Sequence, residues 1–180
     1  LFMNMKIKKL TLLSLIAFTM FYIGRVTTPN IDNTHHITPT ITHTIEHQYI
    51  DELIDYESEA IYIKQTFKSN MSTSKIKHLL IYIHGMCEHY DLNYNLVKSV
   101  ISTESGWKYN AKSSAGAVGL MQIMKACAKD YKTPHSEMYD PYVNVTIGIK
   151  YLSKLTKQFN NTLTALVGYN EGPRYAKNYK

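Results

Sequence analysis

The stretch "ESGWKYNAKSSAGAVGLMQIM" runs from Glu104 to Met124 and sets one acidic side chain among small, weakly polar residues. Its glycines let the backbone turn sharply and approach a ligand closely. The stretch also holds one amide, Gln122, and a single carboxylate, Glu104. This composition is typical of a ligand-binding loop, and the flanking sequence indicates which kind.

The residues before this loop predict a helix that carries Glu104 on its apolar face. The apolar positions and the carboxylate recur at three- and four-residue steps: Val97, Val100, Ile101 and Glu104. A buried carboxylate is costly unless a partner neutralises it, and burial raises its pKa. Lys98 and Lys108 point away from this face, so no basic residue lies one turn from the acid. The pattern therefore favours a functional acid over a buried salt bridge.

The same periodicity predicts further helices on both sides. Ser72, Thr73 or Ser74 can cap a helix that continues to Tyr90. A helix is expected through "GLMQIMKACAKDY", residues 119–131, with Leu120, Ile123, Met124, Cys127 and Tyr131 on one face. Another follows the turn at Asp140-Pro141, and a last one runs from about Thr162 to the Gly172-Pro173 stop.

The chain of 180 residues, 44% of them apolar, is long enough for one domain with a tail or anchor. In residues 1–25, lysines precede an apolar run from Leu10 to Gly24, which predicts export through a cleaved signal or a retained membrane anchor; a buried N-terminal helix is the third reading. Residues 26–71, rich in Thr, Pro and His at first, are interpreted as a stalk or linker with a possible helix. Residues 72–180 form the expected catalytic domain.

Charge and cysteine usage leave several options open. The net charge of +6 suits an anionic partner such as a cell-wall polymer, a membrane surface or nucleic acid, but also a solvated surface without ligand. Cys87 and Cys127 either pair in an exported protein or remain two buried thiols. The histidines of the stalk and the trio His84, Glu88 and His89 are interpreted as polar surface, so no metal and no cofactor are predicted.

Four ordered blocks resemble one family. They are Glu104-Ser105-Gly106, Gly119–Met124, Asp140-Pro141 with Asn144 and Gly148, and Tyr169-Asn170-x-Gly172-Pro173. Together they resemble the soluble lytic transglycosylase catalytic domain, which is similar in fold to goose-type lysozyme. The resemblance covers roughly Lys75 to Lys180. It implies a predominantly α fold within the α+β lysozyme-like superfamily, built as a single helical catalytic domain behind an N-terminal signal or anchor and a stalk.

The resemblance also implies a reaction. Such enzymes cut the glycan of peptidoglycan between N-acetylmuramic acid and N-acetylglucosamine and leave a 1,6-anhydro end. Glu104 matches the family's catalytic acid, which first protonates the leaving oxygen and then accepts the proton of the 6-hydroxyl. By the same match Ser113, Gln122, Met124, Tyr169 and Asn170 are expected to bind substrate, although each of them can instead simply pack the cleft wall.

One departure keeps a second reaction in view. Glu171 stands where the family commonly has alanine, and a carboxylate that entered the cleft would favour hydrolysis. We expect Glu171 to face solvent. The alternatives are thus a hydrolytic muramidase and a non-catalytic glycan-binding scaffold; no nucleic-acid-binding motif occurs. The expected partners are peptidoglycan strands, a secretion or conjugation apparatus, and the membrane through the N-terminal segment, with an exported, periplasmic or inner-membrane-anchored location in the cell envelope.

Overall fold

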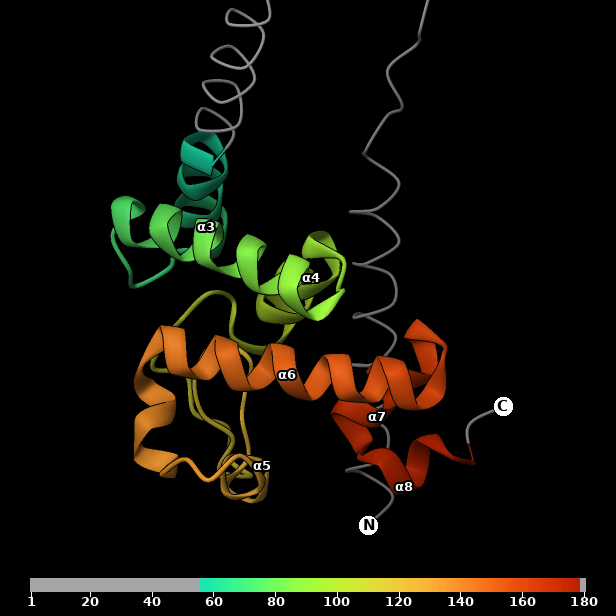
Figure 1. Ribbon diagram of the computed structural model, residues 1–180. Helices are drawn as coiled ribbons and strands as arrows, with labels where there is room; N and C mark the ends of the chain where they lie inside the picture. Colours follow the sequence, from blue (N-terminus) through green and yellow to red (C-terminus); the bar gives the residue numbers. More distant parts are fainter. Residues whose placement is uncertain (1–55, 179–180) are drawn as a thin grey trace, which may run out of the picture.

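The structure, a computed structural model, describes residues 56–178, and these residues are predominantly helical (Figure 1). A helix covers residues 56–67 and is followed by α3 (Thr73–Tyr90), α4 (Tyr94–Ser105), α5 (Lys125–Asp130), the 3-10 helix η1 (His135–Tyr139), α6 (Pro141–Phe159), α7 (Thr162–Glu171) and α8 (Pro173–Ala176). The described part contains no strand, only isolated bridges that join Val118 to Lys112 and to Ile123. The expectation of a mainly helical domain is confirmed.

The predictions for residues 1–25 and for most of the stalk fall outside the described residues. Within residues 56–178, no helix combines the length and the apolar composition that a membrane crossing needs.

Helix α6 organises the domain. In Figure 1 it crosses the middle of the molecule, with α3 and α4 on one side and α7 and α8 on the other. Its buried face includes Val145, Gly148, Leu152 and Leu155 at three- and four-residue steps, and Phe159 at its C-terminal end is half-buried. Gly148 has no side chain where Met121 of the preceding loop packs, and a Cβ there would overlap the Met121 side chain. The loop therefore sits directly on the central helix.

The predicted helix boundaries are confirmed at three places. Ser72 caps α3 by accepting from the N–H of Lys75 at 3.2 Å. Asp140 caps α6 by accepting from the N–H groups of Tyr142 and Val143, each at 2.9 Å, and Pro141 occupies the first helical position. Gly172, with φ of +94°, ends α7 before Pro173 begins α8.

The helix expected over residues 119–131 is wrong in its first half. Only Lys125–Asp130 is helical, and residues 119–124 form a tight loop. The buried amide of Asn144 on α6 explains the difference, because it satisfies the loop backbone in place of helical bonds. Its oxygen accepts from the N–H of Met121 at 2.8 Å, and its nitrogen donates to the carbonyls of Val118 at 2.8 Å and Met138 at 2.9 Å. These bonds fix a backbone in which Gly119 and Gln122 both have positive φ.

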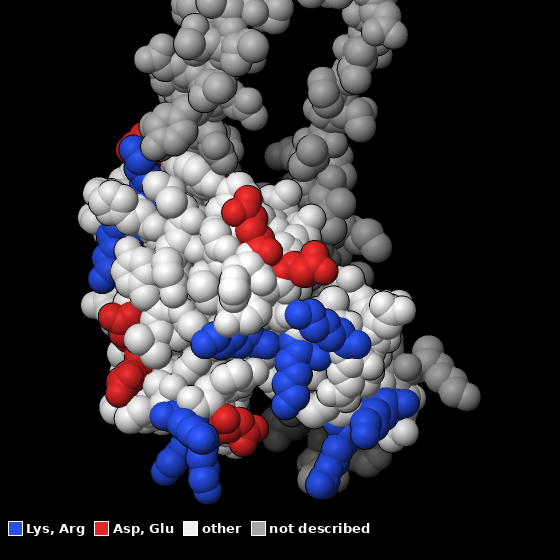
Figure 2. All heavy atoms as spheres, viewed as in Figure 1, with Lys and Arg blue, Asp and Glu red and all other residues white. Residues whose placement is uncertain are grey.

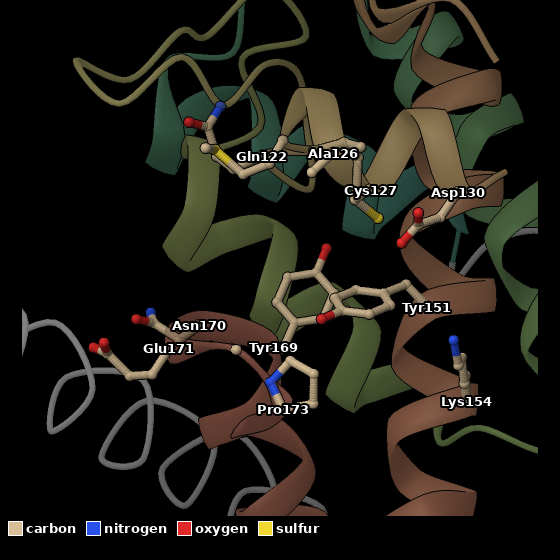
Figure 3. A pocket seen from close by; sticks show the side chains of 13 residues that line it. Gln122, Ala126, Cys127, Asp130, Tyr151, Lys154, Tyr169, Asn170, Glu171 and Pro173 are labelled. Carbon is tan, nitrogen blue, oxygen red and sulfur yellow. The ribbon is translucent and has the colours of Figure 1, made fainter. Parts of the chain in front are cut away.

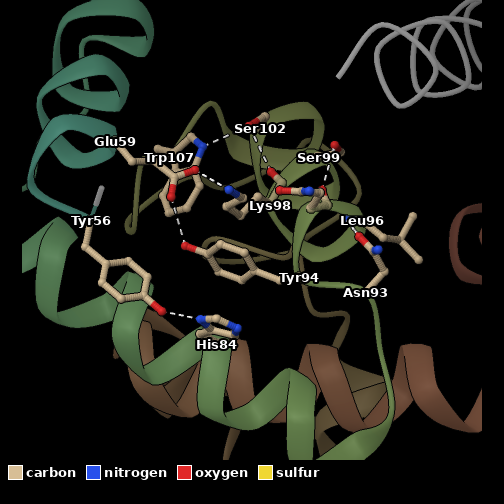
Figure 4. Close-up of polar contacts among 11 residues, drawn as sticks. Tyr56, Glu59, His84, Asn93, Tyr94, Leu96, Lys98, Ser99, Ser102 and Trp107 are labelled. Carbon is tan, nitrogen blue, oxygen red and sulfur yellow. Dashed lines mark hydrogen bonds and ion pairs between the residues drawn. The ribbon is translucent and has the colours of Figure 1, made fainter. Parts of the chain in front are cut away.

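The helix at residues 56–67 packs on the core, so the folded unit begins before residue 72. Tyr56, Ala60 and Ile63 are buried. Figure 4 shows how polar contacts attach the helix to α3 and α4. Glu59 forms an ion pair with Lys98 of α4 and accepts from the hydroxyl of Tyr94 at 3.0 Å.

The trio His84, Glu88 and His89 lies on α3 as predicted. One ring nitrogen of His84 bonds the Tyr56 hydroxyl, and the other lies 4.0 Å from the Glu88 carboxylate. The ring of His84 also stacks on Tyr94 with centroids 4.7 Å apart. These contacts give His84 a structural role at the junction of three helices.

Candidate active site

Glu104 lies in the last turn of α4, on the face that the sequence assigned to it. Its neighbours on that face, Val97, Val100 and Ile101, are buried, and Glu104 itself is half-buried. Burial raises the pKa of the Glu104 carboxyl from 4.5 to about 7. Lys98, the basic residue of the same helix, is paired with Glu59. Desolvation is thus what perturbs the acid, and within residues 56–178 no opposite charge contributes to the shift.

The backbone turns sharply directly after Glu104. Gly106 caps α4 in the left-handed conformation, and Trp107 follows with φ of +60°. Trp107 is 1% exposed; its indole N–H donates to the Ser102 hydroxyl at 2.8 Å, and its carbonyl accepts from the Ser69 hydroxyl at 2.6 Å. The sequence reasoning missed this anchor, although Trp107 is the chain's single tryptophan and follows a glycine. It fixes the exit of the chain from the acid-bearing helix.

Ser113 and Gln122 shape the loop that faces α7. The Ser113 hydroxyl accepts from the N–H of Ala117 at 3.0 Å inside a tight turn, which leaves its own hydrogen to be donated. The Gln122 amide nitrogen donates to the carbonyls of Gly119 at 2.9 Å and Ala111 at 3.3 Å. Both amide hydrogens are used by the loop, so the amide oxygen is the atom through which Gln122 can address a ligand.

Tyr169 of α7 connects the acid to this loop. Its hydroxyl donates to the Met121 carbonyl at 2.8 Å, and its ring lies 5.4 Å from that of Tyr151. Burial raises the Tyr169 pKa well above its usual value, and the negative charge of Glu104 raises it further. The phenol is therefore a neutral donor at any ordinary pH, and it lies within electrostatic reach of Glu104.

A cavity of about 380 Å³ opens beside Tyr169, between α5, α6 and α7 (Figure 3). Of the residues that the sequence analysis expects to act on or bind substrate, Gln122, Met124, Tyr169 and Asn170 line it. Met124 is 44% exposed and projects from the start of α5. Glu104 and Ser113 are not among the lining residues. The site thus has two adjoining parts, the acid at the end of α4 and the cavity, and Tyr169 belongs to both.

The cavity also contains side chains that the sequence reasoning missed. Asp130, Tyr151 and Lys154 come from α5 and α6, where their spacing reads as ordinary helix surface. Cys127, which the sequence placed on the apolar face of its helix, lines the cavity as well. Cys127 is half-buried and Cys87 is buried, and both are free thiols.

Glu171 lies beside Asn170 at the edge of the cavity (Figure 3). It is half-buried, whereas the sequence favoured a solvent-facing position. The structure therefore places a carboxylate near the cavity at the position where the family motif commonly has alanine.

A second, smaller cavity of about 240 Å³ lies between α3 and α6. Tyr82, Tyr131 and Tyr142 line it, and the rings of Tyr82 and Tyr142 meet edge to face at 5.1 Å. Its lining, within the described residues, includes no carboxylate.

Basic side chains occur over much of the face that Figure 2 shows. Several Lys and Arg side chains lie over its middle and lower part, where Figure 1 places α5, α6 and α8, with others at the upper left and a few acidic side chains between them. Along α6 the basic side chains are Lys150, which is half-buried, and the exposed Lys154 and Lys157. Such a surface favours an anionic polymer over a cationic one.

Comparison with known proteins gives the family. Residues 81–180 match the family described as Transglycosylase SLT domain. The soluble lytic murein transglycosylase of Salmonella typhimurium is 36% identical over 93 residues, which covers 46% of this chain and 14% of that protein. The transglycosylase of Enterobacteria phage PRD1 is 36% identical over 87 residues, or 48% of this chain and 32% of that protein. The membrane-bound lytic murein transglycosylase E of Buchnera aphidicola subsp. Acyrthosiphon pisum is 37% identical over 79 residues, or 39% and 36%.

The fold has a counterpart among solved structures. The X-ray structure of an inactive mutant of lytic transglycosylase Slt from Pseudomonas aeruginosa matches with a TM-score of 0.50 at 27% identity, over 54% of this chain and 17% of that one. This chain thus spans well under half the length of each of these relatives. The profile match covers more than half of the chain, and the ordered sequence blocks fall within it. The chain therefore belongs to the transglycosylase SLT domain family.

Proposed function

We propose that this domain is a peptidoglycan lytic transglycosylase that cleaves the bond between N-acetylmuramic acid and N-acetylglucosamine and forms 1,6-anhydro ends. The observation that carries the proposal is the Glu104 carboxyl, whose pKa burial raises to about 7. An acid with this pKa is protonated often enough near neutral pH to donate a proton, and its conjugate base can take one back. The relatives named as lytic murein transglycosylases support the same reaction.

In the proposed mechanism Glu104 acts twice. The protonated carboxyl gives its proton to the glycosidic oxygen as the bond from that oxygen to C1 of the muramic acid breaks. The carboxylate then accepts the proton of the 6-hydroxyl as O6 bonds to C1. Glu104 therefore regains in the second step the proton that it gave in the first, and the reaction consumes no water.

The remaining site residues would hold the glycan. Gln122 offers its amide oxygen to a sugar hydroxyl, and Asn170 offers an amide from the opposite wall. The exposed thioether of Met124 packs against the apolar face of a sugar ring. Ser113 has a hydroxyl hydrogen to donate, and Tyr169 fixes the loop rather than donating to the substrate, because its hydroxyl is bonded to Met121.

A hydrolytic muramidase is the second candidate, and Glu171 is the observation that favours it. This half-buried carboxylate at the cavity edge could activate a water molecule that attacks the sugar from the far side.

The proposed setting is the cell envelope. The apolar N-terminal segment would export the chain and attach it to the membrane, so that cutting is confined to one place in the wall. Local opening of this kind suits the passage of a secretion or conjugation apparatus. One of the relatives is a phage transglycosylase and another is named as membrane-bound.

Mass spectrometry of the products tests the proposal. Purified peptidoglycan is digested with the wild-type chain, with Glu104→Gln, and with Glu137→Gln, which removes an exposed carboxylate of η1 outside the cavity. We expect products lighter by one water than hydrolytic ones, lost in the Glu104 variant and retained in the control. Reducing-end products would establish the muramidase. Binding of glycan without any cleavage would mean that the domain is a non-catalytic glycan-binding scaffold.

A further inference from the structure

We propose that the end of the cavity between α5 and α6 binds the peptide stem of peptidoglycan, with Lys154 receiving a stem carboxylate and Asp130 receiving the side-chain amine of the stem's diamino acid. This inference rests on the proposed function, because it assigns the part of the same substrate that hangs from the muramic acid.

The geometry provides two opposite charges on facing walls of one cavity. Asp130 extends from the last turn of α5 and Lys154 from the C-terminal half of α6, and both line the cavity. In Figure 3 their charged groups lie at the same end, with the ring of Tyr151 beside them, while Gln122 and Asn170 lie farther toward the other end. The cavity therefore has a charged end and an amide-lined end.

The Asp130 carboxylate and the Lys154 ammonium group do not pair with each other. Within the described residues, no ion pair joins Asp130 to Lys154. Both nevertheless act on the same thiol: burial raises the Cys127 pKa, the charge of Asp130 raises it further and the charge of Lys154 lowers it. Opposite charges that border the same end of one cavity without pairing with each other suit a ligand that carries both signs.

A stem peptide meets this requirement and a sugar ring does not. Sugar hydroxyls and N-acetyl groups are neutral and call for amides, hydroxyls and aromatic faces. The stem carries carboxylates and a free amine, separated along a short chain. It leaves the glycan at the muramic acid, whose scissile bond would lie near Glu104 and Tyr169, and Tyr169 also lines the cavity. The stem therefore starts at the shared residue and has the charged end within its path.

The first experiment compares cleavage of two substrates by the full chain. One substrate is glycan with intact stems, and the other is glycan from which an amidase has removed the stems. We expect Lys154→Gln and Asp130→Asn each to lower kcat/KM on the stem-bearing glycan about fivefold more than on the stem-free glycan. This is the size of effect expected for one ion pair between a partly enclosed side chain and a charge of the stem.

Matched controls separate this effect from a change in total charge. Lys157→Gln removes the next exposed lysine of α6, and Glu137→Gln removes an exposed carboxylate of η1, and neither residue lines the cavity. We expect both controls to leave the ratio between the two substrates at the wild-type value. Equal losses in cavity variants and controls would overturn the stem site and leave only a general attraction to the polymer.

A second experiment uses free stem peptide and NMR titration, so it does not depend on cleavage. The wild-type chain should bind the peptide, with weaker binding in both cavity variants. Acetylation of the diamino acid's amine should weaken binding to the wild type and to Lys154→Gln about equally, and should have little further effect on Asp130→Asn. If the wild type does not bind the peptide, the stem site is wrong even where glycan is cleaved. If it binds in this pattern but cleaves neither glycan, the proposed reaction fails and the site stands.

Discussion

The hydroxyl of Tyr169 donates a hydrogen bond of 2.8 Å to the backbone carbonyl of Met121, so α7 is tied to the loop that follows the acid-bearing helix. The two residues are far apart in sequence, and each belongs to a different block of the family motif. Because the phenol proton is donated to the Met121 carbonyl, Tyr169 holds α7 to this loop, and we predict that the bond positions the loop beside Glu104. A positioning role of this kind can be measured.

Tyr169→Phe keeps the ring and removes this one bond. We expect the free energy of unfolding to fall by about 1 kcal/mol, the usual net value of one hydrogen bond, and turnover to fall about tenfold through a displaced loop. Urea unfolding and product formation measure the two effects. Tyr175→Phe is the control, since Tyr175 is 53% exposed on α8. Unchanged turnover in Tyr169→Phe would show that the loop keeps its place without the bond.

Gly119 should tolerate no side chain, whereas Gly116 should tolerate one at modest cost. Both have positive φ, +82° and +88°, so alanine is strained at either position. A Cβ at Gly119 would also overlap the amide of Asn144 and the Met138 carbonyl, while a Cβ at Gly116 meets nothing within 4 Å. We expect Gly116→Ala to destabilise by about 1 kcal/mol and Gly119→Ala by about 3 kcal/mol or more. Thermal unfolding of the pair isolates the steric part, and equal losses would mean that Asn144 can move aside.

The sequence predicts the long helices and the position of the acid, because both depend on local patterns. Val97, Val100 and Ile101 recur at helical spacing, and Glu104 continues their face, so its burial can be read from the chain itself. The cap at Asp140 is likewise local, since its side chain bonds the N–H groups of the next residues. For these features no distant contact has to be known.

The loop over residues 119–124 could not be predicted in this way. Its apolar residues occur at helical steps, but Asn144 on α6 replaces the helical bonds with three bonds of its own. The charged end of the cavity could not be predicted from the sequence for a related reason. Asp130 and Lys154 look like ordinary surface residues of separate helices, and only the tertiary arrangement in which α5, α6 and α7 border one cavity brings them together.

Removing one partner of the ion pair between Glu59 and Lys98 should lower the free energy of unfolding far more than removing one partner of the surface pair between Glu57 and Lys77. Side-chain exposures are 11% and 9% in the first pair but 47% and 29% in the second, whose atoms lie 2.9 Å apart. Removing one partner of a buried pair leaves an uncompensated charge, so we expect Glu59→Gln to cost about 3 kcal/mol. Glu57→Gln should cost less than about 1 kcal/mol.

The double variant Glu59→Gln with Lys98→Met separates the pair from its burial cost. It should recover part of the stability lost in Glu59→Gln, because no charge remains buried. Urea unfolding measures all of these variants. Equal effects at the two glutamates would show that water reaches the pair at Lys98.

Glu104 should make the domain less stable as the pH rises from 4.5 to 7. Its pKa is about 7 in the folded chain, above the usual 4.5. As the pH rises, the unfolded state therefore loses this proton at a lower pH than the folded state does, and ionisation stabilises the unfolded state relative to the folded one. Folding stability is therefore undiminished below pH 4.5, falls through the interval, and stays reduced above pH 7. The shift corresponds to about 3 kcal/mol at full burial, and solvent screening lowers this to about 2 kcal/mol for a half-buried group.

Glu104→Gln has no proton to lose, so it should be more stable than the wild type at pH 8 and close to it at pH 4. The difference in free energy of unfolding between the two proteins, measured in urea at steps across this range, should grow between pH 4.5 and 7 and then level off. Glu137→Gln, which changes an exposed carboxylate, should show no such growth. A flat difference for Glu104→Gln would mean that the carboxyl is solvated or paired in solution, and it would remove the physical basis for Glu104 as a general acid near neutral pH.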